Sequence, residues 1–175
     1  MATKTSGVPE AALYYFDTIV LSNFALSGRF DLLIDRYGPR AQITPEVLDE
    51  VSDGIVAGHR ELKQIEAAVE KGACSAAPPL TIAERTIYRD LLGTLGSGEA
   101  SCITCAQCRG GLVVTDDRAA RNCCSERGVL FTGTIGILKI CCREGILAPR
   151  EADVLLQNMI NAGYFSPVDQ ISVLL

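Results

Sequence analysis

The alternation of short apolar segments with helical segments is the feature that most constrains the fold of this chain. The run AALYYFDT at 11–18 predicts a strand ending in an aspartate, and IVLSNFALSG then has helical spacing up to Gly28. The order recurs in GLVVTDD and RAARNCCSERG at 111–128, and VLFTG predicts a further strand. Strands separated by helices pair in parallel, so we expect an α/β protein, a three-layer α/β/α sandwich around a central parallel sheet.

The rest of the chain continues this pattern. AQIT predicts a short strand before the helix that Pro45 opens, 73–80 is expected to be extended, and Thr81 suits the N-cap of the next helix. Another helix is expected after GSGEA at 96–100. Further helices are predicted at 29–37, 45–58, 60–72, 82–93, 134–145 and 149–163. A length of 175 residues then suits one domain spanning 1–175, with 1–10 expected to be flexible.

Composition excludes several classes of protein. With 48% apolar and 21% charged residues the chain is expected to be globular rather than disordered. Its apolar runs are interrupted before they reach membrane-spanning length, so no membrane association is expected. The first ten residues lack the basic-then-apolar order of a signal peptide, and we therefore expect a cytoplasmic protein.

Charge and the rarer residue types narrow the chemistry. A net charge of −5 argues against a broad basic surface for nucleic acid, so any RNA contact must be local. Eight cysteines without an export signal are expected to be reduced thiols rather than a disulfide framework. His59 is the only histidine and lies between two predicted helices, where a cap or surface role is expected. A histidine-rich metal site or a nucleophilic triad is therefore weakly supported.

Acidic residues follow two of the predicted strands. Asp17 ends the first strand and the pair Asp116–Asp117 ends GLVV, while Glu50 and Glu99 lie within or at the start of helices that could face the same edge. In parallel α/β sheets, functional groups gather beyond the carboxyl ends of the strands. The alternative is that each acid is a helix cap or a solvated surface charge, as most acids are.

Carboxylates that converge repel one another unless a cation lies between them. Mg²⁺ prefers oxygen ligands and keeps several waters, so such a cluster suits a hard divalent ion. An ion of this kind can activate water for attack on phosphorus and stabilise the leaving oxygen. The acidic set therefore points to nuclease chemistry.

Four sequence blocks resemble the PIN-domain nucleases, and more closely their VapC-like toxin branch. FDTIVLSNFALSGRFDLL resembles the opening motif, with Asp17 as its aspartate and Thr18 as the hydroxyl that follows. ITPEVLDEV resembles the proline-led helix, and its offsets select Glu50 rather than Glu46. GSGEASCITCA resembles the motif that places the third acid at Glu99.

The last block, LVVTDDRAAR followed by GVLFTGTIGIL, resembles the final acidic segment of the family. Its T-x-D spacing favours Asp117 as the principal ligand and its strand end favours Asp116, so both stay candidates. The resemblance implies metal ligation by Asp17, Glu99, Asp116 and Asp117. It also makes Asn23 and Thr134 polar neighbours of the site, although a helix position and an N-cap would explain them equally well.

The resemblance implies an endoribonuclease that depends on Mg²⁺ or Mn²⁺ and cleaves RNA phosphodiester bonds. It further implies a homodimer and a toxin that a small antitoxin protein holds inactive. The alternative from another class is a PIN-like module that binds nucleic acid or regulates without catalysis. A phosphatase-type or receiver-type reading, with Asp17 as nucleophile, ranks lower because no second aspartate follows two residues later.

Two further patterns have competing interpretations. Cys102, Cys105 and Cys108 have C-x-x-C-x-x-C spacing, but Leu112 stands where an iron–sulfur motif needs its fourth cysteine. We expect these residues to pack as a broad buried helix face rather than to bind metal. Arg118 and Arg121 could contact phosphate or pair with the aspartates, or could simply lie on an exposed helix.

Overall fold

A computed structural model describes residues 12–175, so the flexibility expected for residues 1–10 concerns a segment outside the described part. Its central sheet has five strands in the order β3-β2-β1-β4-β5, and every neighbouring pair is parallel. This confirms the predicted fold class. The strands are β1 (Tyr14–Phe16), β2 (Ala41–Ile43), β3 (Ser75–Ala76), β4 (Leu112–Val114) and β5 (Leu130–Thr132).

Burial distinguishes the inner strands of the sheet from its edge strands. All residues of β1, β2 and β4 are buried, as strands covered by helices on both faces must be. The edge strand β5 is partly exposed, and the opposite edge, β3, has two residues. The extended segment expected at 73–80 is thus in part a strand, which was missed because two small residues carry no alternating pattern.

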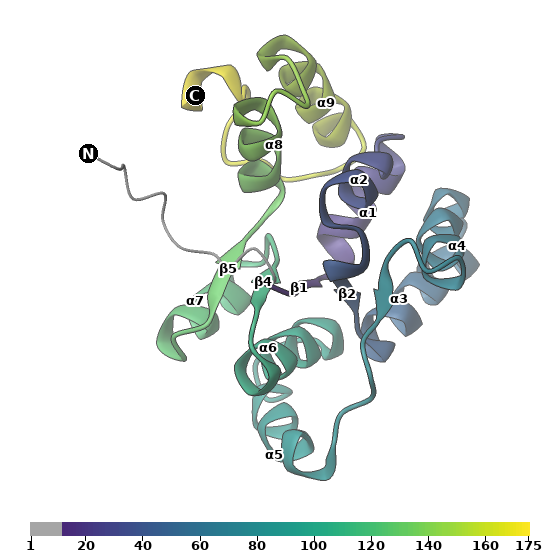
Figure 1. Cartoon of the computed structure of the whole chain (residues 1–175), viewed down its shortest axis with the longest axis vertical. Helices are drawn as coiled ribbons and strands as arrows, with labels where there is room; N and C mark the ends of the chain where they lie inside the picture. The colour runs from purple at the N-terminus through teal and green to yellow at the C-terminus, as the bar shows by residue number, and fades with distance from the viewer. Residues whose placement is uncertain (1–11) are drawn as a thin grey trace.

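Helices cover both faces of the sheet. Figure 1 shows α5, α6 and α7 on one side and α1, α2, α8 and α9 on the other. Helix α3 contacts both α1 and α6 and so joins the two layers. The described helices are α1 (Thr18–Leu26), α2 (Asp31–Tyr37), η1 (Gly38–Arg40), α3 (Pro45–Val56), η2 (Arg60–Leu62), α4 (Lys63–Glu70), α5 (Ile82–Leu91), α6 (Ser97–Arg109), α7 (Arg118–Glu126), α8 (Thr134–Arg143), α9 (Pro149–Asn161) and η3 (Ser172–Leu174).

Local sequence sets several of these boundaries. Thr81 caps α5 with a full capping box, because its hydroxyl accepts from the Glu84 backbone while the Glu84 carboxylate accepts from Thr81 N–H. Helix α6 begins at Ser97, inside the GSGEA segment rather than after it as expected. No helix of the described residues is long and apolar enough to cross a bilayer.

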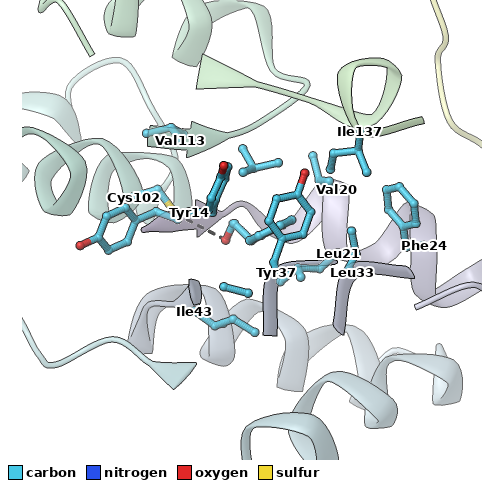
Figure 2. Packing of buried hydrophobic residues seen from close by; sticks show 14 of the residues in the cluster. Tyr14, Val20, Leu21, Phe24, Leu33, Tyr37, Ile43, Cys102, Val113 and Ile137 are labelled. Atoms are coloured by element: carbon cyan, nitrogen blue, oxygen red, sulfur yellow. Dashed lines mark hydrogen bonds between the residues drawn. The ribbon is translucent and has the colours of Figure 1, made fainter. Parts of the chain in front are cut away.

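The core lies on both sides of β1. Figure 2 shows Val20 and Phe24 of α1 close to Ile137 of α8, while the Tyr37 ring lies 4.6 Å from the Tyr14 ring, centroid to centroid. On the other face, buried Cys102 of α6 directs its thiol to the carbonyl of Phe16 at 3.5 Å. β1 is thereby fixed between helices from both layers.

The strand order creates a switch point between β1 and β4. From β1 the chain builds outward to β2 and β3, and then returns to the other side of β1 for β4 and β5. The connections leaving β1 and β4 therefore run in opposite directions. In open α/β sheets a crevice forms at this point beyond the carboxyl ends of the strands. Asp17 follows β1 and the Asp116–Asp117 pair follows β4 shortly after Thr115, so these acids lie at the switch point.

Candidate functional site

Asp17 is the most deeply placed acid of the site. It lies between β1 and α1, with 1% of its surface exposed, and its side chain does not cap α1. Thr115, at the end of β4, donates its hydroxyl to Asp17 Oδ2 at 3.0 Å and accepts the backbone N–H of Asp117 at 3.1 Å. One threonine thus links the loops that follow the two central strands.

Glu50 of α3 joins two helix starts. Its Oε2 accepts the hydroxyl of Thr18, the first residue of α1. Its Oε1 accepts both the Ser97 hydroxyl and the Gly98 backbone N–H, each at 2.8 Å, at the first turn of α6. Unpaired N–H groups make a helix start favourable for negative charge, which explains why a carboxylate is stable there.

The glycines of GSGEA make room for two carboxylates. A Cβ at Gly98 would lie 2.6 Å from Glu50 Oε2, and a Cβ at Gly96 would lie 2.5 Å from Glu99 Oε2. Real side chains do not approach this closely, so any larger residue would displace an acid. These glycines are explained by close approach to the carboxylates rather than by backbone conformation.

The charges of the acids affect one another's ionisation. Burial raises the pKa of Asp17 to about 7, and the charges of Glu99 and Glu50 add to the rise while the Thr115 hydroxyl opposes it. Burial also raises the pKa of Glu99, with further contributions from Asp117 and Glu50. We call Asp17, Glu50, Glu99 and Asp117 the acidic cluster.

No cationic side chain of residues 12–175 forms an ion pair with a member of the acidic cluster. The ion pairs formed within residues 12–175 are Arg29–Asp31, Arg36–Glu144, Arg109–Glu84 and Arg121–Asp116, and none includes a member of the cluster. Buried and half-buried carboxylates that repel one another are a donor set suited to a hard divalent cation.

The cluster is not a preformed metal cage. Across residues 12–175, no three His, Cys, Asp or Glu side chains are grouped as metal ligands usually are. Several carboxylate oxygens of the cluster are instead hydrogen-bonded to the protein: both oxygens of Glu50 and one oxygen each of Asp17 and Asp117 accept protein donors. Repulsion between the acids also favours separation when no cation lies between them.

Comparison with protein families adds independent information. A family model described as a PIN domain matches residues 13–175, which is nearly the whole chain. The chain belongs to the PIN-domain family. PIN domains are generally nucleases, so a nuclease-type function is indicated. No curated protein and no solved structure matches the chain in the corresponding searches.

Asp116 of this PIN domain belongs to a different hydrogen-bond network. Its Oδ1 pairs with Arg121 and accepts the Thr134 backbone N–H, both at 3.0 Å, and its Oδ2 accepts the Thr134 hydroxyl at 2.6 Å and the Asn23 amide at 3.2 Å. Asp116 thereby caps α8, whose N-cap residue, Gly133, has no side chain to do so. The structure thus separates the two neighbouring aspartates, which sequence alone could not.

Asp117 has the opposite environment. Its Oδ1 caps α7 by accepting Ala120 N–H at 2.7 Å, and its charge contributes to the raised pKa of Glu99. It is therefore the aspartate of the pair that approaches the acidic cluster. Arg118 of the same helix is exposed and forms no ion pair with any described residue.

Several contributing residues were not found from the sequence. Thr115, Ser97 and Gly98 hold the acids in place, but single hydroxyl and glycine residues beside an acidic motif give no separate signal. Tyr164 was also missed. Burial raises the pKa of its phenol, and the nearby Asp116 carboxylate raises it further. Tyr164, in the segment after α9, therefore lies beside the Asp116 network.

No cysteine belongs to the acidic cluster, but Cys102 lies near it, because burial and the charges of Asp17, Glu50 and Glu99 raise the pKa of its thiol. All eight are free thiols, and five are buried: Cys74, Cys102, Cys105, Cys124 and Cys141. In each of the adjacent pairs Cys123–Cys124 and Cys141–Cys142, one member is buried, namely Cys124 and Cys141. The broad buried face expected for Cys102, Cys105 and Cys108 is wrong at Cys108, which is exposed because α6 ends one residue later. His59 is exposed beside η2, as expected for a surface residue.

Proposed function

We propose that this chain is an endoribonuclease that depends on Mg²⁺ or Mn²⁺ and cleaves RNA phosphodiester bonds at the acidic cluster. The observation that carries the proposal is the burial of Asp17 among Glu50, Glu99 and Asp117 without a cationic side chain in an ion pair with any of them, within the part of the chain that the structure describes. Membership of the PIN-domain family supports the nuclease class.

The acids of the cluster have two different roles in this proposal. Asp17, Glu99 and Asp117 would hold the cation, and Glu50 would fix the starts of α1 and α6 through Thr18, Ser97 and Gly98. When bound, a divalent cation lowers the pKa of a ligated water and stabilises charge on phosphoryl oxygens. Thr115 orients the Asp17 carboxylate by holding Oδ2. Asp116, kept as a ligand candidate by sequence, is proposed to position α8 and Arg121 instead.

The resemblance to VapC-like toxins supports a more specific biological role for the chain. In that role the chain is a cytoplasmic homodimer and the toxin of a toxin–antitoxin pair, inhibited by a small antitoxin protein. The same resemblance supports RNA rather than DNA as the substrate. The non-catalytic PIN-like module is the alternative, and the presence of all the expected acids speaks against it.

The test is cleavage of an end-labelled single-stranded RNA by protein dialysed against EDTA, with Mg²⁺ or Mn²⁺ then added back. We expect cleavage only with added cation, accompanied by a rise in Tm on cation addition. DNA of the same sequence should stay intact. Cleavage of DNA but not of RNA would contradict the proposal that RNA is the substrate. A rise in Tm without cleavage of either strand would favour the non-catalytic module.

A further inference from the structure

A pocket of about 550 Å³ opens beside Asp116, outside the acidic cluster. It is bounded by the start of α7, strand β5, helix α8 and the segment 164–167 that follows α9. Pockets of this size hold small-molecule ligands in many proteins, and a single nucleotide falls within that range. The pocket is therefore large enough for one residue of a nucleic-acid strand.

Asp116 connects the pocket to the acidic cluster. It lines the pocket, while the next residue, Asp117, belongs to the cluster. Arg121 also lines the pocket and is held by Asp116 and by the Thr115 carbonyl at 2.9 Å. Because Asp116 and Asp117 are consecutive residues, the pocket and the acidic cluster share the loop that follows β4.

Aromatic side chains line the pocket with unusual exposure. Phe165 is 95% exposed, Phe131 is 39% exposed, and Tyr164 lines the same pocket. The chain has five Phe, five Tyr and no Trp, so three of its ten aromatic residues border this one pocket. Exposed aromatic rings are the surfaces on which proteins stack the unpaired bases of single strands.

Cationic side chains complete the pocket. Arg118 and Lys139 line it, and neither forms an ion pair with any residue of the described part of the chain. The guanidinium of Arg121 lies 5.9 Å from the Phe131 ring centroid, which adds a cation beside an aromatic face. Because the chain has a net charge of −5, such a local group of cations is where an anionic backbone would be attracted.

We propose that this pocket receives one unpaired nucleotide of the substrate strand, with its base stacked on Phe165 or Phe131 and its phosphate beside Arg118 and Lys139. The inference rests on the proposed function, which it deepens by assigning a nucleotide subsite outside the acidic cluster. An acidic peptide would match the cations equally well, but it has no base to cover the exposed rings of Phe165 and Phe131, so a nucleotide is the favoured occupant.

The experiment measures binding of a fluorescent single-stranded RNA by anisotropy, in EDTA so that no cleavage occurs. We compare wild type with Phe165→Ala, which removes an exposed ring, and with Phe165→Trp, which keeps an aromatic face. Ile82→Ala is the control, because Ile82 is 88% exposed on α5 and lies outside the pocket. We expect Phe165→Ala to weaken binding about 10-fold, Phe165→Trp to restore it, and Ile82→Ala to have no effect.

Abasic RNA identifies the occupant. Replacing nucleotides one at a time with abasic residues should weaken wild-type binding at one position, and that loss should vanish in Phe165→Ala. Lys139→Ala should instead reduce the salt dependence of binding by about one phosphate contact. Equal RNA affinity in wild type and Phe165→Ala would overturn the subsite, as would an abasic effect that is the same in both proteins.

A small chromogenic phosphodiester separates this inference from the proposed function. Wild-type hydrolysis of bis(p-nitrophenyl) phosphate with Mn²⁺ reports on the nuclease chemistry without a nucleobase, whereas the RNA affinity of Phe165→Ala in EDTA reports on the subsite without cleavage. If wild type cleaves RNA and Phe165→Ala binds RNA normally, the subsite is wrong and the nuclease proposal stands. If wild type binds RNA through Phe165 but cleaves no substrate, the nuclease proposal is wrong and the subsite stands.

Discussion

At the scale of single residues, Asp17 carries the strongest physical signal. Its carboxyl is almost wholly buried, and burial with the charges of Glu99 and Glu50 raises its pKa from 3.8 to about 7. A group in this state destabilises the folded protein when it ionises. Without a cation, the folded chain therefore takes up a proton at Asp17 that the unfolded chain releases.

The stability of the protein in EDTA should consequently fall as pH rises from about 4 to 7. Between these values the folded state binds more protons than the unfolded state, so the free energy of unfolding decreases with pH. The full shift at Asp17 corresponds to roughly 4 kcal/mol. The Asp17→Asn variant lacks this carboxyl group. Its free energy of unfolding should therefore increase relative to that of wild type as pH rises, and the difference should be largest above pH 7.

Urea denaturation of both proteins at pH 5 and pH 8, in EDTA, measures this effect. Glu99 stays in both proteins, so the difference between them reports the burial of Asp17 together with its interaction with Glu99. A stability difference that is the same at both pH values would contradict the raised pKa of Asp17.

At the scale of secondary-structure elements, the sequence predicted which helices and strands form better than it predicted where each begins and ends. Apolar runs such as LVV, and the Thr81 cap with Glu84 three residues on, were sufficient for β4 and α5 because their signals are local. The start of α6 at Ser97 was missed, since Glu50, 47 residues earlier in the chain, stabilises it by accepting Ser97 and Gly98. Tertiary contacts of this kind leave no mark on the local pattern.

Gly98 provides the element-scale test. Alanine is a better helix former than glycine by about 1 kcal/mol, so propensity alone would make Gly98→Ala stabilising. Its Cβ would, however, lie 2.6 Å from Glu50 Oε2 and 2.9 Å from Oε1. We expect the displaced Glu50 to lower RNA cleavage about 10-fold or more in a folded protein.

Gly93→Ala is the matched control, because its Cβ would make only ordinary contact, 3.5 Å from the Asp90 carbonyl oxygen. RNA cleavage rates and circular dichroism are compared for the two variants and wild type. Wild-type activity in Gly98→Ala would show that the close packing of Glu50 against α6 is not required.

At the scale of the whole molecule, the sheet order brings distant acids together. Asp17 and Asp117 follow the neighbouring strands β1 and β4, and the Thr115 hydroxyl is hydrogen-bonded to the Asp17 carboxylate and to the Asp117 backbone N–H. The sequence predicted that acids follow strands at one edge, since parallel strands share their carboxyl edge. It could not predict the strand order, and therefore could not separate Asp117 at the cluster from Asp116 in the α8 network.

The Asp17→Asn variant tests most directly whether the acidic cluster holds a divalent cation for phosphodiester cleavage. The variant nearly preserves shape and removes one negative charge from the cluster. Asp35→Asn, an exposed acid on α2, is the matched control for loss of charge. The measurement is the rate of single-stranded RNA cleavage with saturating Mn²⁺, alongside the change in Tm that Mn²⁺ produces.

Wild type and Asp35→Asn should cleave equally and should rise in Tm on Mn²⁺ addition. Asp17→Asn should lose about 100-fold or more in rate and most of the Mn²⁺-induced rise in Tm, while melting at least as high as wild type in EDTA. Undiminished cleavage by Asp17→Asn with an unchanged response to Mn²⁺ would contradict the account.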